Sequence, residues 1–152
     1  MDLHMRNKVA IVTGGASGIG EKTAEFFVQE GVKVVVADAN KGRIEKTVGF
    51  LGGIGGEVKG IYCDVTDEKM VSQMVHQAVA DFGTLDFLVN SAGLGGMMKS
   101  LETAERAEWQ QILEVNLIGS IYCCKAVMPI LREKNEGRIV NIASEAGVSG
   151  ER

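Results

Sequence analysis

Cysteine, histidine and proline are scarce in this sequence, and their scarcity excludes several classes of protein. The 152 residues include three cysteines, two histidines and one proline. Cys63, Cys123 and Cys124 are odd in number and show no CxxC spacing, so neither a disulfide framework nor a structural zinc site is predicted. We expect a reducing compartment and no bound metal.

Long apolar runs and an excess of positive charge are missing too. No uninterrupted apolar run approaches the roughly 18 residues that span a bilayer, and the first eight residues do not resemble a signal peptide. The formal net charge is -4, and no cluster of lysine and arginine offers a surface for phosphate backbones. The sequence therefore predicts a cytoplasmic protein with no membrane and no nucleic-acid partner.

Hydrophobic residues make up 45% of the chain and charged residues 24%, which is typical of a soluble globular protein. A chain of this length is large enough to bury a core of its own. Residues 1–152 are therefore predicted to form a single domain.

Short apolar segments alternate with stretches of helical spacing along the chain. The apolar segments at 9–12, 32–37, 57–63, 85–89 and 138–143 are interpreted as strands, and the stretches at 19–30, 41–51, 66–82 and 103–134 as helices. Parallel strands joined by right-handed helical crossovers are the common solution for this pattern. We predict an α/β fold of the Rossmann type, a three-layer αβα arrangement around a parallel sheet with strand order 3-2-1-4-5.

Two local signals refine the predicted helices. Thr66 precedes two acidic residues, Asp67 and Glu68, and is predicted to cap the third helix at its amino end. Pro129 falls near the end of the fourth helix, where its ring is expected to kink or disrupt the last turns.

A glycine-rich turn, TGGASGIG, follows the first predicted strand. Glycines at Gly14 and Gly18 let the backbone turn sharply and approach a pyrophosphate at the start of the next helix, where free N–H groups favour an anion. Gly20 would allow close packing of that helix. Such a loop is often an ordinary turn, but its position after a buried strand favours dinucleotide binding.

Asp38 ends the second predicted strand, 18 residues beyond Gly20. An acidic side chain at this place can accept hydrogen bonds from an adenosine ribose, and it would repel a 2′-phosphate. Although acids are common at helix starts for other reasons, this context predicts NAD rather than NADP as the cofactor.

Several motifs together resemble the short-chain dehydrogenase/reductase family. They are TGGASGIG, the Asp64-Val65 pair, the segment Asn90-Ser91-Ala92-Gly93, Asn116 and the segment GRIVNIAS that ends at Ser144. They follow the family's order and spacing across nearly the whole chain. The resemblance implies a nicotinamide-dependent oxidoreductase.

The same resemblance implies roles for individual residues. The glycine motif would bind the cofactor through Gly14, Ser17, Gly18, Ile19 and Gly20, and NADP-preferring members often have a basic residue at the place of Ser17. Asp64 would bind the adenine amino group, although it is also a plausible turn former. Val65 would line the adenine pocket, and Asn90, Ala92 and Gly93 would support the cofactor and the central sheet.

Two further residues would act on the substrate side. The family's helix asparagine, here Asn116, distorts its helix and helps to hold a water in a proton relay. The serine after the fifth strand, here Ser144, would hydrogen-bond the substrate oxygen and stabilise the charge that develops during hydride transfer. Residues 94–99 are a further candidate for the wall of a substrate cleft.

The family's Tyr-x-x-x-Lys motif is not found in these 152 residues. In the family, that lysine lowers the pKa of the tyrosine, which exchanges a proton with the substrate. The family's later strands would be missing as well. Three explanations are open, namely part of a longer protein, a cleavage product or a short protein in its own right, and the first two are favoured.

The expected function of the complete chain is NAD(H)-dependent interconversion of an alcohol and a carbonyl, with a small-molecule substrate and a homo-oligomeric assembly. The 152 residues as given are expected to be inactive, because they lack the tyrosine and lysine of the family's motif. The alternative is a non-catalytic nucleotide-binding or interaction module.

Overall fold

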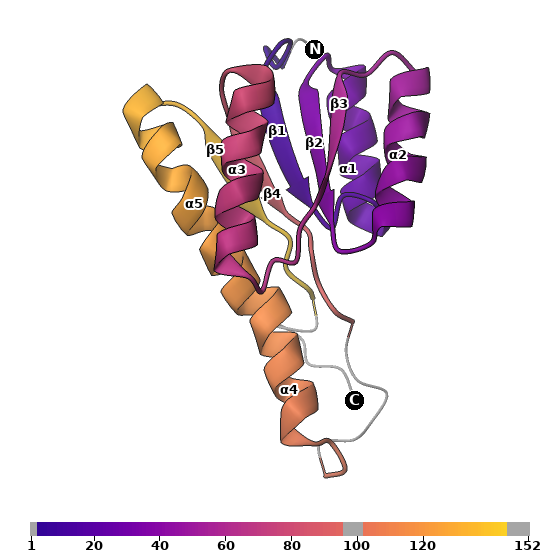
Figure 1. Ribbon diagram of the computed structural model, residues 1–152, viewed down its shortest axis with the longest axis vertical. Coiled ribbons are helices and arrows are strands. Elements are labelled where there is room, and N and C mark those ends of the chain that lie inside the picture. The colour runs from indigo at the N-terminus through magenta and orange to yellow at the C-terminus, as the bar shows by residue number, and fades with distance from the viewer. Residues whose placement is uncertain (1–2, 96–101, 146–152) are drawn as a thin grey trace.

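A five-stranded parallel sheet forms the centre of the computed structural model, which describes residues 3–95 and 102–145 (Figure 1). The strands lie in the order β3-β2-β1-β4-β5, which confirms the predicted Rossmann-type topology. Parallel register is continuous across the centre, since Ile11 of β1 faces Val35 of β2 and Leu88 of β4. The strands are β1 (Val9–Thr13), β2 (Lys33–Asp38), β3 (Val58–Tyr62), β4 (Phe87–Asn90) and β5 (Arg138–Asn141).

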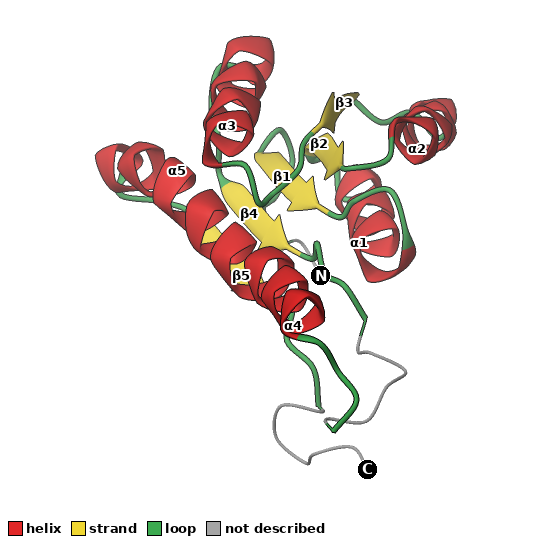
Figure 2. Cartoon of the chain, turned by 60° about the horizontal axis from the view of Figure 1, so that its bottom comes forward, coloured by secondary structure: helices red, strands yellow, loops and turns green. Residues whose placement is uncertain are grey.

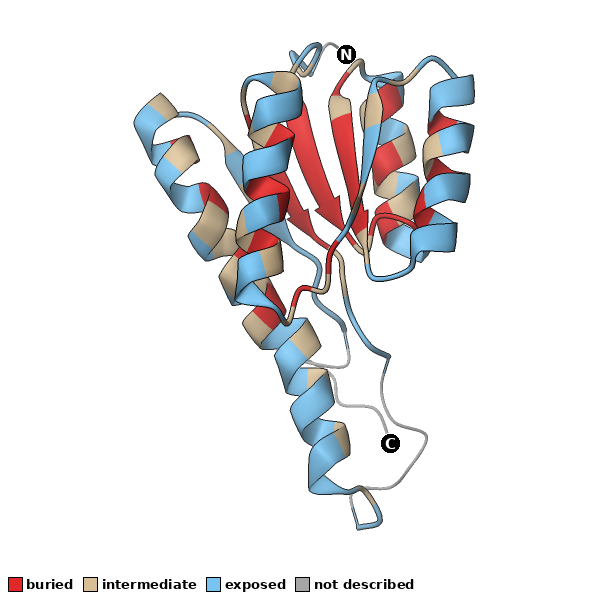
Figure 3. Cartoon of the chain, in the orientation of Figure 1, coloured by how far each residue is buried: buried red, intermediate tan, exposed pale blue. Residues whose placement is uncertain are grey.

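Helices cover both faces of the sheet, as Figure 2 shows. Helices α1 (Gly18–Gln29) and α2 (Lys41–Gly53) pack on one face, and α3 (Glu68–Phe82) and α5 (Gly119–Lys134) pack on the other. Successive side chains of a strand point to opposite faces, so an apolar run such as Val34-Val35-Val36 supplies both cores. Strand β1 is accordingly buried along its whole length, and β2 is buried except at its two ends (Figure 3).

The predicted cap of α3 is wrong by one residue. Asp67, rather than Thr66, is the N-cap, and its Oδ1 accepts hydrogen bonds from the backbone N–H groups of Lys69 and Met70. Thr66 instead donates from both its backbone N–H and its hydroxyl to Asp64 Oδ1. An aspartate carboxylate satisfies two amides at once here, which explains why it takes the capping position.

The predicted long helix begins at Arg106 and has three parts. They are α4 (Arg106–Leu113), the π-helical segment η1 (Glu114–Ile118) and α5. The start is fixed by a capping box in which the Glu105 and Glu108 side chains each accept a hydrogen bond from the other's backbone N–H. The helix then continues through Pro129 to Lys134, so the predicted disruption of its last turns is wrong.

The helix projects beyond the carboxyl ends of the strands, and α4 forms the lower extension in Figure 1. Neither α4 nor η1 has a buried residue. The combined stretch Arg106–Lys134 is long and apolar enough to cross a bilayer, with 17% of its most apolar window buried, although soluble core helices meet the same criterion. Length and composition are therefore weak evidence for a membrane span.

Candidate cofactor cleft and substrate-side cavity

The turn between β1 and α1 is closely packed against the end of β4. Gly14 has a φ of 61°, and a Cβ there would lie 2.8 Å from the backbone of Ala92. A Cβ on Gly20 would lie 2.2 Å from the carbonyl oxygen of Gly14. Only glycine fits these two places without movement of the backbone. The sequence thus keeps the start of α1 close to the ends of β1 and β4.

Thr13 connects the same two strand ends through its side chain. Its hydroxyl accepts hydrogen bonds from the backbone N–H groups of Ser91 and Ala92, each at 3.2 Å. It also lies 3.5 Å from the carbonyl oxygen of Val89, to which it can donate. This buried threonine fixes the turn after β4 relative to the glycine turn after β1.

The amino end of α1 has its amides available for an anion. Its N-cap, Ser17, makes no capping hydrogen bond through its side chain, whereas Asn40 caps α2 and Asp67 caps α3. Gly18 has a positive φ of 52°, and no atom lies within 4 Å of the place that a Cβ would take there, so the approach to these amides is open. The donor set therefore fits a pyrophosphate of a dinucleotide.

Asp38 is held at the carboxyl end of β2 by two backbone amides. Its Oδ2 accepts from Ala16 N–H at 3.3 Å, and its Oδ1 accepts from Asn40 N–H at 3.0 Å. The first bond ties the carboxylate to the glycine turn. The carboxylate thereby faces the space above that turn, where the expected ribose would lie.

A cavity of about 520 Å³ brings most of the expected cofactor residues together. Gly20 and Asn90 lie behind its wall, where both are buried and neither contributes to the lining. The expected residues that do line it are Gly14, Ser17, Gly18, Ile19, Asp38, Asp64, Val65, Ala92 and Gly93. We call this cavity the cofactor cleft.

Asp64 and Val65 lie at the end of the cofactor cleft that follows β3. Asp64 forms a turn, since its Oδ1 accepts from both the backbone and the hydroxyl of Thr66. The turn-forming interpretation of Asp64 therefore accounts for one carboxylate oxygen, and the residue also lines the cleft. Val65 packs tightly against α5, where a Cβ on Gly119 would come within 2.6 Å of it.

A cysteine next to Asp64 also lines the cofactor cleft. Burial, together with the nearby carboxylates of Asp64 and Asp67, raises the pKa of the Cys63 thiol to about 11. Burial likewise raises the pKa of Cys123 to about 12. Both thiols therefore stay protonated and unreactive at neutral pH.

Asn90 joins β4 to β5 and α5 from inside the structure. Its Nδ2 donates to Asn141 Oδ1 at 2.8 Å and lies 3.4 Å from the sulfur of Cys124. Its Oδ1 is buried and has no partner among the described residues. These contacts link β4 to β5 and α5 at the edge of the sheet where the cofactor cleft opens. They are of the kind expected of a residue that supports the central sheet.

Asn116 lies in the middle of η1 and fixes the chain that follows Gly93. Its Oδ1 accepts from Leu94 N–H at 2.7 Å, and its Nδ2 donates to the Leu94 carbonyl oxygen at 3.1 Å. The Ser120 hydroxyl donates to the backbone carbonyl of Asn116 at 3.2 Å. The expected helix distortion is present as the π-helical turn around Asn116.

Ser144 lies three residues beyond the end of β5 and is exposed. It lines a second cavity of about 740 Å³, which we call the substrate-side cavity, together with Asn116 and Ser120. The two cavities share the residues Ser91, Ala92, Gly93 and Ile142. The expected cofactor residues and the expected catalytic residues therefore line adjoining spaces at one edge of the sheet.

A model of the family described as short chain dehydrogenase matches residues 8–152. The chain belongs to the short-chain dehydrogenase/reductase family. This confirms the resemblance inferred from the motifs.

Relatives of this family align with almost the whole chain. A (2S)-[(R)-hydroxy(phenyl)methyl]succinyl-CoA dehydrogenase subunit of Thauera aromatica is 38% identical over 148 residues, which is 96% of this chain and 58% of that protein. A D-threitol dehydrogenase of Mycolicibacterium smegmatis is 37% identical over 145 residues, covering 95% and 55% respectively. The chain thus spans a little more than half the length of these relatives.

Solved structures of family members have the same fold. NAD+-bound xylitol dehydrogenase superposes with a TM-score of 0.94 at 36% identity, over 97% of this chain and 57% of that one. A short-chain dehydrogenase/reductase from Burkholderia phymatum, in complex with NAD, gives 0.94 at 33% identity, over 98% and 53%. Two of the structural relatives were therefore determined with NAD bound.

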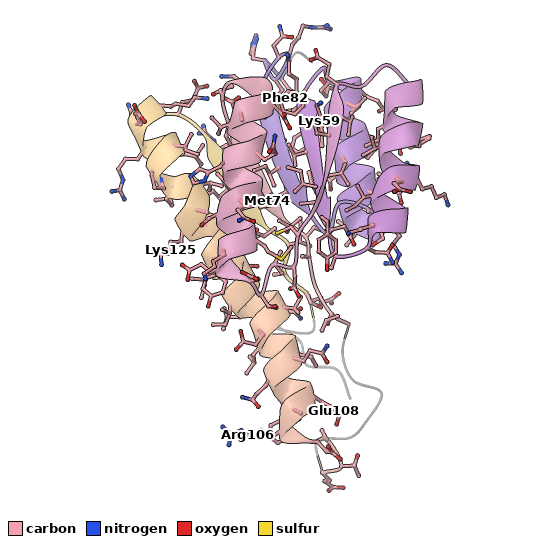
Figure 4. The ribbon with its side chains drawn as sticks, viewed as in Figure 1. Lys59, Met74, Phe82, Arg106, Glu108 and Lys125 are labelled. Carbon is pink, nitrogen blue, oxygen red and sulfur yellow. The ribbon has the colours of Figure 1, made fainter. Side chains whose placement is uncertain are left out.

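The two tyrosines of this family member do not form the tyrosine-lysine pair of the family. Tyr62 is an exposed residue of β3 whose ring lies under Lys41, and Tyr122 packs against the core on α5. Lys125 lines the substrate-side cavity, but its ammonium bonds to Glu68 at 2.7 Å. Figure 4 shows Lys125 on the outer side of α5, pointing away from the sheet, whereas Met74 of α3 is buried in the core. Neither tyrosine lines either cavity.

Sequence reasoning missed several residues that line the cavities. Arg43 and Gln111 line the cofactor cleft, and Cys124 lines the substrate-side cavity. For Arg43 a signal existed, since it lies in the first turn of the helix that follows Asp38. No sequence signal distinguishes Cys124 from Cys123. Within the described part of the chain no cluster of metal-ligating side chains is found, and the candidate wall at 94–99 lies outside the described residues from position 96 on.

Proposed function

We propose that this chain is the cofactor-binding part of an NAD(H)-dependent dehydrogenase that interconverts an alcohol and a carbonyl. The observation that carries the proposal is the adjoining pair of cavities, one lined by the α1 amino end and Asp38, the other by Ser144 and Asn116. Family membership and two NAD-bound structural relatives support it.

In this proposal each side chain has a limited task. The amides at the start of α1 bind the pyrophosphate, and Asp38 accepts hydrogen bonds from the adenosine ribose. NAD, when bound, supplies the acceptor or donor of hydride. Ser144 donates a hydrogen bond to the substrate oxygen and stabilises its developing charge. Asn116 is a positioning residue that fixes the backbone at Leu94 through its two amide bonds.

The experiment combines cofactor binding with turnover. Titration of the purified chain with NADH, followed by fluorescence, measures binding. Oxidation is then assayed with NAD and an alcohol panel that begins with xylitol and D-threitol, the compounds named for two relatives. In a longer product that carries the family's Tyr-x-x-x-Lys pair, we expect Ser144→Ala to lower kcat by about 100-fold without weakening NADH binding.

A matched control is Ser72→Ala, which removes a hydroxyl from α3 at a position that lines neither cavity. We expect it to leave both binding and kcat unchanged. Full activity in Ser144→Ala would refute the role of Ser144, and failure to bind any nicotinamide dinucleotide would refute the proposal as a whole.

A second candidate function is a nucleotide-binding module without catalysis. It is favoured by one observation, that neither Tyr62 nor Tyr122 lines a cavity, so the described residues include no tyrosine placed as proton donor. NADH binding without turnover of any alcohol or carbonyl in the panel would support this function over the first. Turnover that Ser144→Ala abolishes would exclude it.

We also propose that the protein is cytoplasmic, does not enter a membrane, binds no nucleic acid and assembles with copies of itself. The negative net charge and the three free cysteines support the location. Leu113, Leu117, Ile121 and Met128 are exposed along α4, η1 and α5, and this apolar surface supports assembly. Sedimentation of the purified protein measures the oligomeric state.

A further inference from the structure

The three cysteines of the chain differ in how far a reagent can reach their sulfur atoms. Cys63 and Cys123 are 2% and 0% exposed, and both belong to the core that α3 and α5 form with the sheet. Cys124 is partly exposed. Among the three, Cys124 alone lines the substrate-side cavity. A small reagent in that cavity therefore meets the sulfur of Cys124 and neither of the other two.

Two amide side chains surround this sulfur, at the ends of the strands that α5 crosses in Figure 2. Asn90 ends β4 and Asn141 ends β5. Asn90 Nδ2 donates to the sulfur at 3.4 Å, and the thiol of Cys124 donates to Asn141 Oδ1 at 3.9 Å. Asn90 Nδ2 also donates to Asn141 Oδ1, at 2.8 Å. The N–H of Asn90 can therefore bind the deprotonated sulfur, which is the form that reacts with electrophiles.

The same amide of Asn90 contains an acceptor without a donor. Asn90 is 3% exposed, and its Oδ1 has no hydrogen-bond partner in the part of the chain that the structure describes. Because Nδ2 of this amide contacts the sulfur, Oδ1 lies close to Cys124 as well. The thiol does not fill the vacancy, since it donates to Asn141. A buried oxygen without a donor is costly, and a hydroxyl group attached to the sulfur would supply the missing donor.

We propose that Cys124 is oxidised by hydroperoxides to a sulfenic acid whose hydroxyl donates to Asn90 Oδ1. The sulfur attacks the terminal oxygen of the hydroperoxide, so that an S–O bond forms and the O–O bond breaks. The sulfur loses two electrons, and the hydroperoxide is reduced to an alcohol, or to water in the case of hydrogen peroxide. The thiol proton goes to the departing oxygen. The product carries the donor that the buried acceptor lacks.

Oxidation of Cys124 changes the substrate-side cavity and leaves the cofactor cleft as it is. Cys124 lines the first of these together with Ser144 and Asn116, and it does not line the second. A small thiol that condenses with the sulfenic acid forms a mixed disulfide, releases water and fills part of the space that Ser144 lines. Access to the substrate-side cavity thereby depends on oxidant. The inference goes beyond the proposed function and does not rest on it.

The test treats the reduced, purified chain with hydrogen peroxide and traps sulfenic acid with dimedone, and mass spectrometry of the peptides locates the adduct. We expect the adduct at Cys124, with Cys63 and Cys123 unmodified. Cys124→Ser should abolish it. Cys123→Ser is the matched control, because it removes the neighbouring thiol, which lines neither cavity, and it should keep the adduct. Equal labelling of the three cysteines would overturn the proposal.

The lifetime of the sulfenic acid tests the role of Asn90, and it is measured by adding dimedone at increasing times after the peroxide has been removed. We expect a lifetime about tenfold longer in the folded chain than in the chain unfolded in urea. Asn90→Leu should remove most of this gain, because it deletes the vacant acceptor. Asn141→Leu is the matched control, since it deletes the other amide but keeps Asn90 Oδ1, and it should shorten the lifetime by less than about threefold. Equal effects of the two substitutions would overturn the role of Asn90.

Circular dichroism shows whether Asn90→Leu folds, since Asn90 also joins β4 to β5. If it does not fold, the folded and urea-unfolded parent chains decide, and equal lifetimes in the two would overturn the proposal.

NADH titration of the oxidised chain keeps this inference apart from the proposed function. We expect the affinity for NADH to change by less than about twofold on oxidation, because Cys124 does not line the cofactor cleft. A large loss of NADH binding with labelling confined to Cys124 would contradict that placement. A reduced chain that binds no NADH but is labelled at Cys124 would refute the proposed function and support this inference.

Discussion

One sheet is built from two segments of the chain, β1 to β3 and β4 to β5. The helices of the two segments differ in how far they are buried. In the first segment, α1 and α2 close a core against β1 and β2 that includes Ala24, Val28 and Leu51. In the second, α4 and η1 contribute no buried residue, and Leu113, Leu117 and Ile121 are between 49% and 54% exposed. Figure 3 shows this contrast along the length of the long helix.

The difference teaches that apolar composition alone does not determine burial. Val140 of β5 is 48% exposed, whereas Val36 of β2 is fully buried, although both are valines in parallel strands. A strand is buried only when neighbours lie on both sides and helices cover both faces. The cofactor cleft lies mainly on the well-packed segment, and the substrate-side cavity lies on the exposed one.

One link between the two segments is the buried carboxylate of Asp86, just before β4. Its Oδ2 accepts from Val9 N–H at 2.9 Å, and its Oδ1 pairs with Lys134 at the end of α5. Burial alone would raise the pKa of Asp86, but hydrogen bonds from Lys134 and Val9, and the charges of Lys134 and Lys8, lower it below its usual range.

Loss of the interactions of Asp86 should lower the free energy of unfolding more than any of the substitutions that follow. We expect Asp86→Asn to lower the free energy of unfolding by about 4 kcal/mol, because Lys134 would keep its charge with only the neutral oxygens of Thr84 and Leu85 to accept from it. Urea denaturation measures the change. Lys8→Gln is the control and should cost much less, since Lys8 lies 3.6 Å from Asp86 and is partly exposed. An equal loss in both variants would contradict this view.

The pH dependence of that loss follows from the lowered pKa. The stabilisation by Asp86 is fully present above its unfolded pKa of about 3.9, and it is lost as pH falls through the lower folded pKa. The difference in stability between the parent chain and Asp86→Asn should therefore be constant near pH 7 and shrink below about pH 4. A difference that grows on acidification would refute the assignment.

Within the well-packed segment, Gly20→Ala should have the next largest effect. The new Cβ would lie 2.2 Å from the Gly14 carbonyl oxygen, so the glycine turn or α1 must move. We expect a loss of about 3 kcal/mol and weaker NADH binding. Gly49→Ala in α2 is the control, because no atom lies within 4 Å of the place that the new Cβ would take. This substitution should stabilise the chain by about 0.5 kcal/mol. Equal effects would show that packing at Gly20 is adaptable.

The smallest expected change in stability concerns two neighbouring residues on different faces of α5. Val127 of α5 is fully buried, and its neighbour Met128 is 41% exposed. We expect Val127→Ala to cost about 1.5 kcal/mol and Met128→Ala less than about 0.5 kcal/mol. Thermal or urea denaturation measures both. A larger cost for Met128→Ala would show that the exposed apolar surface is covered in solution.

Much of the fold could be predicted from the sequence because its signals are local. Apolar runs such as Val34-Val35-Val36 identify strands buried on both faces, and glycine turns identify where they end. The register of a helix cap is less certain, since Thr66 and Asp67 are adjacent and both can cap. Only the competing hydrogen bonds of Thr66 with Asp64 decide that Asp67 takes the position.

In the candidate site too, some residues could be inferred from local sequence signals, whereas others depend on contacts between distant parts of the chain. Gly14, Gly18 and Asp38 could be singled out from the sequence because they lie at or shortly after predicted strand ends, where parallel sheets bind ligands. The interaction of Asn116 with Leu94 joins residues 22 positions apart, and the contact of Asn90 with Asn141 joins residues 51 apart. Such contacts depend on how strands and helices pack against one another, which no local sequence pattern predicts.

The sequence by itself determined the order of strands and helices, the glycine turn after β1 and the acid that ends β2, because chain direction and backbone sterics act between neighbouring residues. Tertiary structure decided that the two cavities adjoin at Ser91–Gly93, that Asp86 is shared by β1 and α5, and that Arg43 faces the same cleft as Asp38. Those facts arise from parallel pairing, which brings the ends of distant strands to one edge of the sheet.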